Sequence, residues 1–298
     1  KPDQVLPFST GVIGEPLPVA LIEQAMPQAL ANMAEDNWLN AAWGILTTDT
    51  RPKGSSRTIE LDGKVITITG IAKGSGMIRP DMATMLAYIA TDAGLDQPSL
   101  SALIQHCTER SFNRITVDGD TSTNDACVLA ATGASGVRLA QGDSAWPVFV
   151  QAVESVFIEL AQAIIRDGEG VTKCVTIDVT GGANSQECLD VAYTVAHSPL
   201  VKTALFASDA NWGRILAAVG RAGLAELDVS RVRIWLGDVL IAERGGRAAS
   251  YTEERGSAAI AGEEVLVRID LARGDASETI WTTDLSHEYI RINAEYRS

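Results

Sequence analysis

The sequence predicts a layered α/β or α+β fold with mixed or antiparallel sheets. Helix-like and strand-like periodicities are interspersed along its 298 residues, which indicates helices that pack on sheets. Several strand-like runs are separated by short turns, and such turns join antiparallel neighbours. Together these two observations favour this class over a doubly wound nucleotide-binding fold.

Helical spacing of apolar residues predicts four helices in the first part of the chain. They are expected over residues 19–35, 80–94, 99–113 and 143–165. Pro27 should kink the first helix or mark its start, and Pro80 should lie in the first turn of the second. Ser99 is expected to cap the third helix. A later stretch, 185–206, predicts one or two helices broken near Pro199.

Strand-like runs rich in β-branched residues occur in both halves of the chain. They lie at 57–62, 64–69, 173–179, 231–237, 238–243, 263–271, 278–286 and 289–296. Asp62-Gly63 separates the first two, and this dipeptide is typical of the type I′ turn of a hairpin, which needs positive φ at both positions.

The composition favours chemistry on small molecules. The formal net charge is −14, and an acidic surface repels phosphate groups, so neither nucleic acid nor an anionic membrane is an expected partner. The hydrophobic content of 46% suffices for a sizeable core. The longest apolar helix carries Glu154 and Glu159, and no basic-then-apolar leader opens the chain, so neither a membrane span nor a signal peptide is expected.

The cysteines and histidines give little sign of a metal site. Four cysteines form no CxxC pair and are typical of a reducing cytosol, and the adjacent His106 and Cys107 are a weak zinc signal. The run 118–125, DGDTSTND, leaves a cation site open, beside the alternative of an Asx-rich turn that caps a helix. It does not match the EF-hand pattern.

Three further loops have both a functional and a structural interpretation. Residues 70–77, GIAKGSGM, lack the order of a phosphate-binding loop and fit a tight turn between a strand and a helix. Residues 166–170, RDGEG, and 208–214, SDANWGR, suit substrate contacts or ordinary turns. A GxSxG elbow is missing, so a serine hydrolase triad has little support.

Seven segments, spread along nearly the whole chain, resemble the ornithine acetyltransferase family, also called the bifunctional glutamate N-acetyltransferases of arginine biosynthesis. They are LPFSTGVIGEPLP, AAWGILTTDTRPK, GIAKGSGMIRPDMATML, FNRITVDGDTSTND, IRDGEG, SDANWGR and INAEY. The resemblance implies the α/β layered fold of a self-processing enzyme with an N-terminal threonine. Family members carry roughly another hundred residues before the STG motif, and we expect that segment to be absent here.

The resemblance implies self-cleavage between Ala83 and Thr84, which would divide the chain into segments 1–83 and 84–298. Thr84 would then be both an N-terminal residue and the nucleophile. A threonine hydroxyl is a poor nucleophile near neutral pH and needs an adjacent base. Cleavage supplies an α-amine with a pKa of about 8 on the same residue, which would allow acyl transfer without a catalytic histidine.

The resemblance also implies roles for residues outside the cleavage motif. Thr10 and Gly11 match the family's oxyanion-stabilising pair, and one such donor is typically worth about 3–4 kcal/mol. Lys73 matches a lysine that contacts the substrate's α-carboxylate, and a solvated surface lysine is the alternative. The family's full set of substrate positions falls on Thr47 (with Thr48 as an adjacent rival), Lys73, Thr84, Glu169, Asn293 and Ser298.

The implied activity moves acetyl from N2-acetylornithine to glutamate through an acetyl-threonine intermediate. No metal, nucleotide or prosthetic group is implied, and the use of acetyl-CoA as a second acetyl donor stays open. The family architecture predicts two chains from one precursor that pair into a cytoplasmic heterotetramer. A self-processing N-terminal-nucleophile aminopeptidase or amidohydrolase is the alternative, although the related aminopeptidases use serine. A non-catalytic amino-acid sensor is a third hypothesis.

Overall fold

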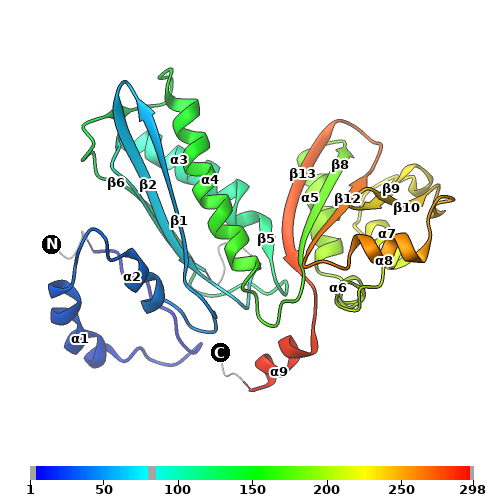
Figure 1. Ribbon diagram of the computed structural model, residues 1–298, viewed down its shortest axis with the longest axis horizontal. Coiled ribbons are helices and arrows are strands. Elements are labelled where there is room, and N and C mark those ends of the chain that lie inside the picture. The colour runs from blue at the N-terminus through cyan, green and yellow to red at the C-terminus, as the bar shows by residue number, and fades with distance from the viewer. Residues whose placement is uncertain (1–4, 80–84, 296–298) are drawn as a thin grey trace. The chain divides into compact units, whose positions relative to one another are not determined.

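A computed structural model describes residues 5–79 and 85–295, and the chain divides into two compact units. Unit 1 comprises residues 1–113, 120–164 and 295–298, and unit 2 comprises residues 114–119 and 165–294. Each unit is built around one mixed sheet with helices packed on it (Figure 1). The predicted class, a layered α/β fold with mixed sheets, is therefore confirmed.

The sheet of unit 1 has the strand order β1-β2-β3-β6. These strands are β1 (Lys53–Leu61), β2 (Lys64–Lys73), β3 (Leu86–Thr91) and β6 (Ala126–Ala131). Strand β2 runs antiparallel to both β1 and β3, and β6 is parallel to β3. A short parallel pair, β4 (Gly94–Leu95) with β7 (Arg138–Leu139), also belongs to this unit.

The hairpin predicted around Asp62-Gly63 is confirmed. Leu61 pairs with Lys64, which leaves a two-residue loop between β1 and β2. Both loop residues have positive φ, 52° for Asp62 and 73° for Gly63. This is the backbone that a type I′ turn requires, and it explains the choice of aspartate followed by glycine.

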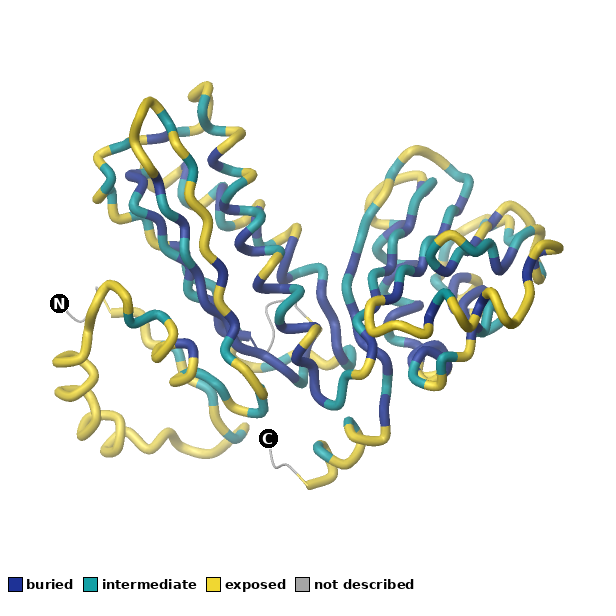
Figure 2. The backbone as a smooth tube through the Cα atoms, viewed as in Figure 1, coloured by how far each residue is buried: buried dark blue, intermediate teal, exposed yellow. Residues whose placement is uncertain are grey.

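The helices of unit 1 are α1 (Val19–Ala31), α2 (Trp38–Gly44), α3 (Gln97–Arg110) and α4 (Trp146–Ile165). Of these, α4 packs closely on the sheet, because Gly70 in β2 has no side chain. A Cβ at Gly70 would lie 2.8 Å from Ile89 and 3.0 Å from Leu160 of α4. In contrast, α1 buries none of its residues and is exposed along its whole length (Figure 2).

Among the described residues, α4 is the one helix whose length and mean hydropathy of 1.7 would suit a membrane span, and 44% of that window is buried. Its fully buried side chains include Phe149, Val153 and Phe157. Glu159 of α4 also contacts the sheet, since it accepts a hydrogen bond from the Ser55 hydroxyl of β1 at 2.6 Å. The packing of α4 is thus that of a helix covering a sheet.

Two predictions about this region are wrong. Residues 86–91 form strand β3 in place of the second half of the helix expected over 80–94, whose residues 80–84 lie outside the described residues. The strand is largely buried on both faces, and such a short apolar run looks alike in a helix and in a covered strand. The cap of α3 is Asp96, which accepts from the backbone N–H of Ser99 at 2.9 Å, so Ser99 is not the cap.

The sheet of unit 2 has the order β11-β10-β9-β12-β8-β13-β5. Its strands are β5 (Ile115–Thr116), β8 (Cys174–Gly182), β9 (Arg233–Leu236), β10 (Val239–Glu243), β11 (Gly246–Arg247), β12 (Glu264–Asp270) and β13 (Ala276–Thr283). Parallel pairing occurs between β12 and β8 and between β13 and β5, and the other neighbours are antiparallel.

The helices of unit 2 are α5 (Ser185–Ala196), α6 (Pro199–Phe206), α7 (Trp212–Gly220), α8 (Glu253–Ala259) and α9 (His287–Glu295). The predicted break at Pro199 is confirmed, because α5 ends before it and α6 begins at it. Helix α5 packs on β8 and β13, and buries Val191 and Val195 against strand residues such as Ile177. The strand predicted at 289–296 is wrong, since these residues belong largely to α9.

Candidate active site

Lys73 ends strand β2 and is buried, with 2% of its surface exposed. Its Nζ atom lies 3.4 Å from the Oγ1 atom of Thr10. Burial lowers the pKa of Lys73 below its ordinary value, against the charges of Asp49 and Asp125, which act to raise it. The alternative of a solvated surface lysine is therefore wrong. A desolvated ammonium beside a hydroxyl is well suited to bind an anionic substrate group.

A buried ion pair holds the loop before β1 next to Lys73. The Nζ atom of Lys53 lies 2.5 Å from the Oδ1 atom of Asp49, and the side chains are 1% and 0% exposed. The same oxygen accepts from the backbone N–H of Gly74 at 2.7 Å, and Oδ2 accepts from that of Thr47 at 3.3 Å. Burial raises the pKa of Asp49, but Lys53 and these N–H groups outweigh it and hold the pKa below its usual value.

The STG segment is anchored by contacts on both sides of its threonine. The ring of Phe8 meets that of Tyr88 in β3 edge-on, with centroids 5.3 Å apart. The backbone oxygen of Ser9 accepts from the Nδ2 atom of Asn124 at 2.5 Å. These contacts flank Thr10, whose hydroxyl lies beside Lys73, and the oxyanion role of Thr10 and Gly11 stays a prediction.

Asp125 precedes strand β6 and contacts the start of β3. Its Oδ1 atom accepts from the backbone N–H of Met85 at 2.5 Å. Its Oδ2 atom is buried and has no hydrogen-bond partner among the described residues. Burial raises the pKa of Asp125 to about 7, although the Met85 N–H and the charge of Lys73 act to lower it. The predicted cleavage-site residues Ala83 and Thr84 lie outside the described residues.

The cation site considered for residues 118–125 gains no support from the structure. In the part of the chain that the structure describes, no three histidine, cysteine, aspartate or glutamate side chains gather as ligands would. Asp118 accepts a hydrogen bond from the Tyr289 hydroxyl at 3.1 Å, whereas Asp125 binds a backbone N–H. Residues 74–79, which follow β2, contain no helix, and the next described element is strand β3, so within the described residues the turn into a helix expected for residues 70–77 is not seen.

Unit 2 brings together two other residues predicted to bind substrate. Glu169 is 9% exposed, and its Oε2 atom accepts from the Nδ2 atom of Asn293 in α9 at 2.8 Å. Next to Glu169, the backbone of Gly170 approaches α9 closely. Gly170 has φ +64°, and a Cβ on it would lie 2.4 Å from the backbone nitrogen of Tyr289. The Ser286 hydroxyl donates to the Gly170 oxygen at 2.6 Å. The RDGEG segment thus packs against α9 and the residue before it, Ser286.

The remaining predicted residues are less constrained by the structure. Thr47 is exposed and Thr48 is half-buried, so the choice between them stays a prediction, and Ser298 lies outside the described residues. In the SDANWGR loop, Asn211 caps α7 by accepting from the N–H of Arg214 at 3.1 Å, which supports the structural interpretation.

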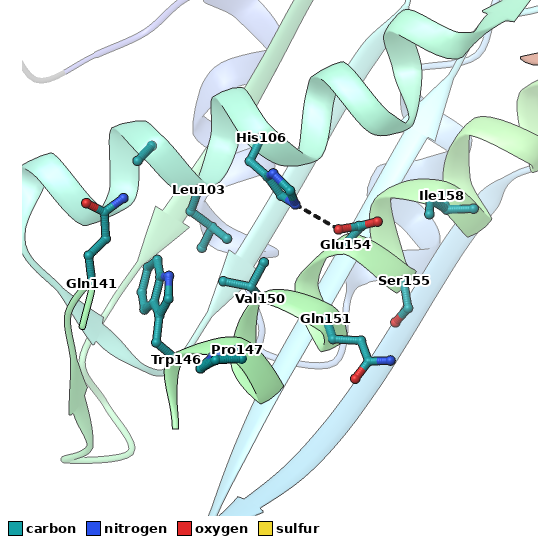
Figure 3. Close-up of a pocket in the computed structure, with 11 residues that line it drawn as sticks. Leu103, His106, Gln141, Trp146, Pro147, Val150, Gln151, Glu154, Ser155 and Ile158 are labelled. Atoms are coloured by element: carbon teal, nitrogen blue, oxygen red, sulfur yellow. Dashed lines mark hydrogen bonds and ion pairs between the residues drawn. The ribbon is translucent and has the colours of Figure 1, made fainter. Parts of the chain in front are cut away.

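Each of the three histidines contacts another side chain. His106 bonds Glu154, His197 bonds Thr116, and the ring of His287 meets that of Phe206. His106 and Glu154 belong to a groove of about 690 Å³ between α3 and α4, where their side chains point toward each other at 2.8 Å (Figure 3). Of the predicted site residues that the structure describes, none lines this groove.

The mixed α/β fold of unit 1 buries the Lys53–Asp49 pair and places the buried Lys73 beside the Thr10 hydroxyl, an arrangement suited to binding a small anionic group. The profile of the ArgJ family matches residues 1–298. The chain belongs to the ArgJ family.

Proteins from three bacteria illustrate the similarity. The arginine biosynthesis bifunctional protein ArgJ of Pseudomonas fluorescens (strain Pf0-1) is 62% identical over 99% of this chain and 73% of its own length. Its counterpart in Psychrobacter arcticus is 57% identical with the same coverage. The crystal structure of arginine biosynthesis bifunctional protein argJ from Bacillus halodurans matches with a TM-score of 0.66 at 38% identity, over 69% of this chain and 96% of that one.

Proposed function

We propose that this chain is an acetyltransferase of arginine biosynthesis that moves acetyl from N2-acetylornithine to glutamate after self-cleavage between Ala83 and Thr84. The observation that carries the proposal is the buried Lys73 ammonium beside the Thr10 hydroxyl, at the edge where β2 ends and β3 begins. Thr84 precedes β3 by two residues, so its covalent neighbour Met85 belongs to the same cluster.

In the proposed reaction, the Thr84 hydroxyl attacks the acetyl carbonyl of the donor and its proton passes to the α-amine. The Thr10 hydroxyl and the Gly11 N–H stabilise the oxyanion. The amine returns the proton to the departing ornithine nitrogen as the C–N bond breaks, which leaves an acetyl ester on Thr84. Glutamate's amine then attacks this ester by the reverse sequence, while Lys73 binds the α-carboxylate common to both substrates.

Three further points belong to the proposal. Thr47 or Thr48, Glu169, Asn293 and Ser298 complete the substrate contacts, and the Glu169 carboxylate suits a substrate ammonium. No metal or prosthetic group takes part, and the cleaved chains pair into a heterotetramer in the cytoplasm.

Intact mass spectrometry beside the Thr84→Ala variant tests this function. The wild type should give two polypeptides divided between residues 83 and 84, and the variant one. Addition of N2-acetylornithine alone should add one acetyl mass to the 84–298 chain, and glutamate should remove it. An uncut wild type without acetyl addition would refute the proposal. Release of ornithine at a steady rate without glutamate would favour the amidohydrolase alternative.

Two variants separate the proposed roles of Thr10 and Lys73. Thr10→Ala should lower the acetylation rate by about 10²–10³, the usual effect of losing one oxyanion donor, with little change in KM. Lys73→Met should raise KM for both substrates, because the lost charge binds the carboxylate in ground and transition states alike. The opposite division of effects would contradict these assignments.

A further inference from the structure

Two buried lysines lie at the edge of the sheet where β1 begins and β2 ends, but the reaction proposed above uses one of them. Lys73, the last residue of β2, and Lys53, the first residue of β1, are each 2% exposed. Lys53 pairs in the sheet with Ala72, the residue before Lys73. Like charges buried near each other are costly unless a carboxylate compensates them. The cluster therefore needs an anion that separates the roles of the two ammonium groups.

Asp49 supplies this anion from the loop before β1. Its Oδ1 atom accepts from the Nζ atom of Lys53 at 2.5 Å and from the N–H of Gly74, which follows Lys73, at 2.7 Å. Its Oδ2 atom accepts from the N–H of Thr47 at 3.3 Å, and the side chain is 0% exposed. One carboxylate thus connects the loop at residue 47, the start of β1 and the end of β2.

We propose that Asp49 is a positioning residue for substrate binding: it holds the Lys53 ammonium and balances its charge, so that Lys73 presents a charged ammonium to the substrate's α-carboxylate. This inference rests on the proposed function, in which Lys73 binds the α-carboxylate of both substrates. Because the Asp49 side chain is fully enclosed, it acts through Lys73 and has no contact with the reacting atoms.

The charges of the described residues that act on Lys73 are those of Asp49, Asp125 and Lys53. Burial lowers the pKa of Lys73, the two carboxylates act to raise it, and Lys53 acts to lower it further. The carboxylates differ, because burial raises the pKa of Asp125 to about 7, whereas the pKa of Asp49 lies below its usual value. Asp49 is therefore the carboxylate that stays ionised throughout the neutral range.

The experiment measures single-turnover acetylation of the enzyme by N2-acetylornithine across a pH series. At each pH, the concentration dependence gives a half-saturating donor concentration and a maximal rate. Binding should weaken on the alkaline side, where Lys73 loses its proton. Asp49→Asn keeps an oxygen for the Gly74 N–H but loses the charge, so the pH at which binding weakens should fall by about one unit. Lys53→Met removes the opposing charge, so this pH should rise.

Opposite shifts separate this role from a structural one, because a loosened loop would weaken binding in both variants without moving their pH profiles apart. Glu159→Gln is the control, since Glu159 pairs with Arg57 of β1 and is not among the charges acting on Lys73. Its profile should coincide with that of the wild type. Unmoved profiles in Asp49→Asn and Lys53→Met, or shifts in the same direction, would overturn the inference.

Folding is checked by circular dichroism, because each single variant leaves one charge buried without its partner. If one of them fails to fold, the shift of the other decides. If both fail, the double variant of Asp49→Asn with Lys53→Met decides, since a buried pair is often replaced without loss of stability. Asp49 acts on Lys73 more strongly than Lys53 does, so the pH at which binding weakens should still fall in the double variant. An unchanged pH there would overturn the inference.

Failure of the inference differs from failure of the proposed function. A wild type that takes up no acetyl from N2-acetylornithine would refute the function, and the inference with it. An active wild type whose profile is shared by the folded variants would overturn the role of Asp49 alone and leave the proposed function intact.

Discussion

Replacement of Gly170 by alanine should loosen α9 from the segment that carries Glu169. At φ +64° an L-residue pays about 1–2 kcal/mol for left-handed backbone. The added Cβ would also lie 2.4 Å from the Tyr289 nitrogen and 2.9 Å from the Glu288 carbonyl carbon, and these backbone atoms can move only if α9 moves. Overpacking of this kind costs about 1–3 kcal/mol, so we expect a total of about 2–5 kcal/mol.

Gly223→Ala is the matched control, because Gly223 is in the same unit, has φ +80° and has nothing within 4 Å of its virtual Cβ. It should pay the backbone cost alone. Thermal melting should show a larger decrease for Gly170→Ala, at about 2–4 °C per kcal/mol. Hydrogen exchange should speed up in α9 for that variant alone. Equal decreases in melting temperature with unchanged exchange in α9 would refute the argument from close approach.

Two further predictions concern buried lysines. Lys53→Met should lower the free energy of unfolding, measured in urea, by about 3–5 kcal/mol, because it leaves Asp49 buried without its lysine partner. Arg57→Met breaks an exposed ion pair and should lower it by less than about 1 kcal/mol. Similar losses in the two variants would contradict the argument from burial. Burial lowers the pKa of Lys202 to about 8, against nearby aspartates, and unfolding returns it to about 10.4. The unfolded state therefore binds more protons between these values, so the free energy of unfolding should rise with pH across that window. Lys202→Met should remove the rise, and a slope unchanged in this variant would show that other groups cause it.

Sequence patterns predicted the elements whose signals are local. The Asp62-Gly63 hairpin and the break at Pro199 depend on the φ values that single residues allow, and both are present. The strand expected at 289–296 failed because Ile290, Ile292 and Ala294 alternate with polar residues as in a half-buried strand. In the structure, the Ser286 hydroxyl accepts from the Tyr289 N–H at 3.2 Å at the start of α9. The alternation could not reveal this contact.

The candidate site divides in the same way. Motif resemblance identified Thr10, Lys73, Glu169 and Asn293, and the structure pairs the first two and the last two. Their supporting groups depend on contacts between distant segments, as when Gly74 donates to the side chain of residue 49. The sequence gives the positions of its aspartates, but it does not show which backbone N–H groups donate hydrogen bonds to them. The one local hint was the i,i+4 spacing of Asp49 and Lys53.

The pairing of β2 with β3 has a consequence for the life of the cleaved protein. Six residue pairs, from Ile68 with Thr91 to Lys73 with Leu86, join strands that lie on opposite sides of the predicted scission. After cleavage between them, this strand pairing would still hold the two polypeptides together without a covalent bond. They would therefore remain associated and separate only in denaturant. Refolding of the nicked protein would become a second-order, concentration-dependent association of two chains. Unfolding would then be far harder to reverse than in the precursor, so scission would make the mature fold a state reached once.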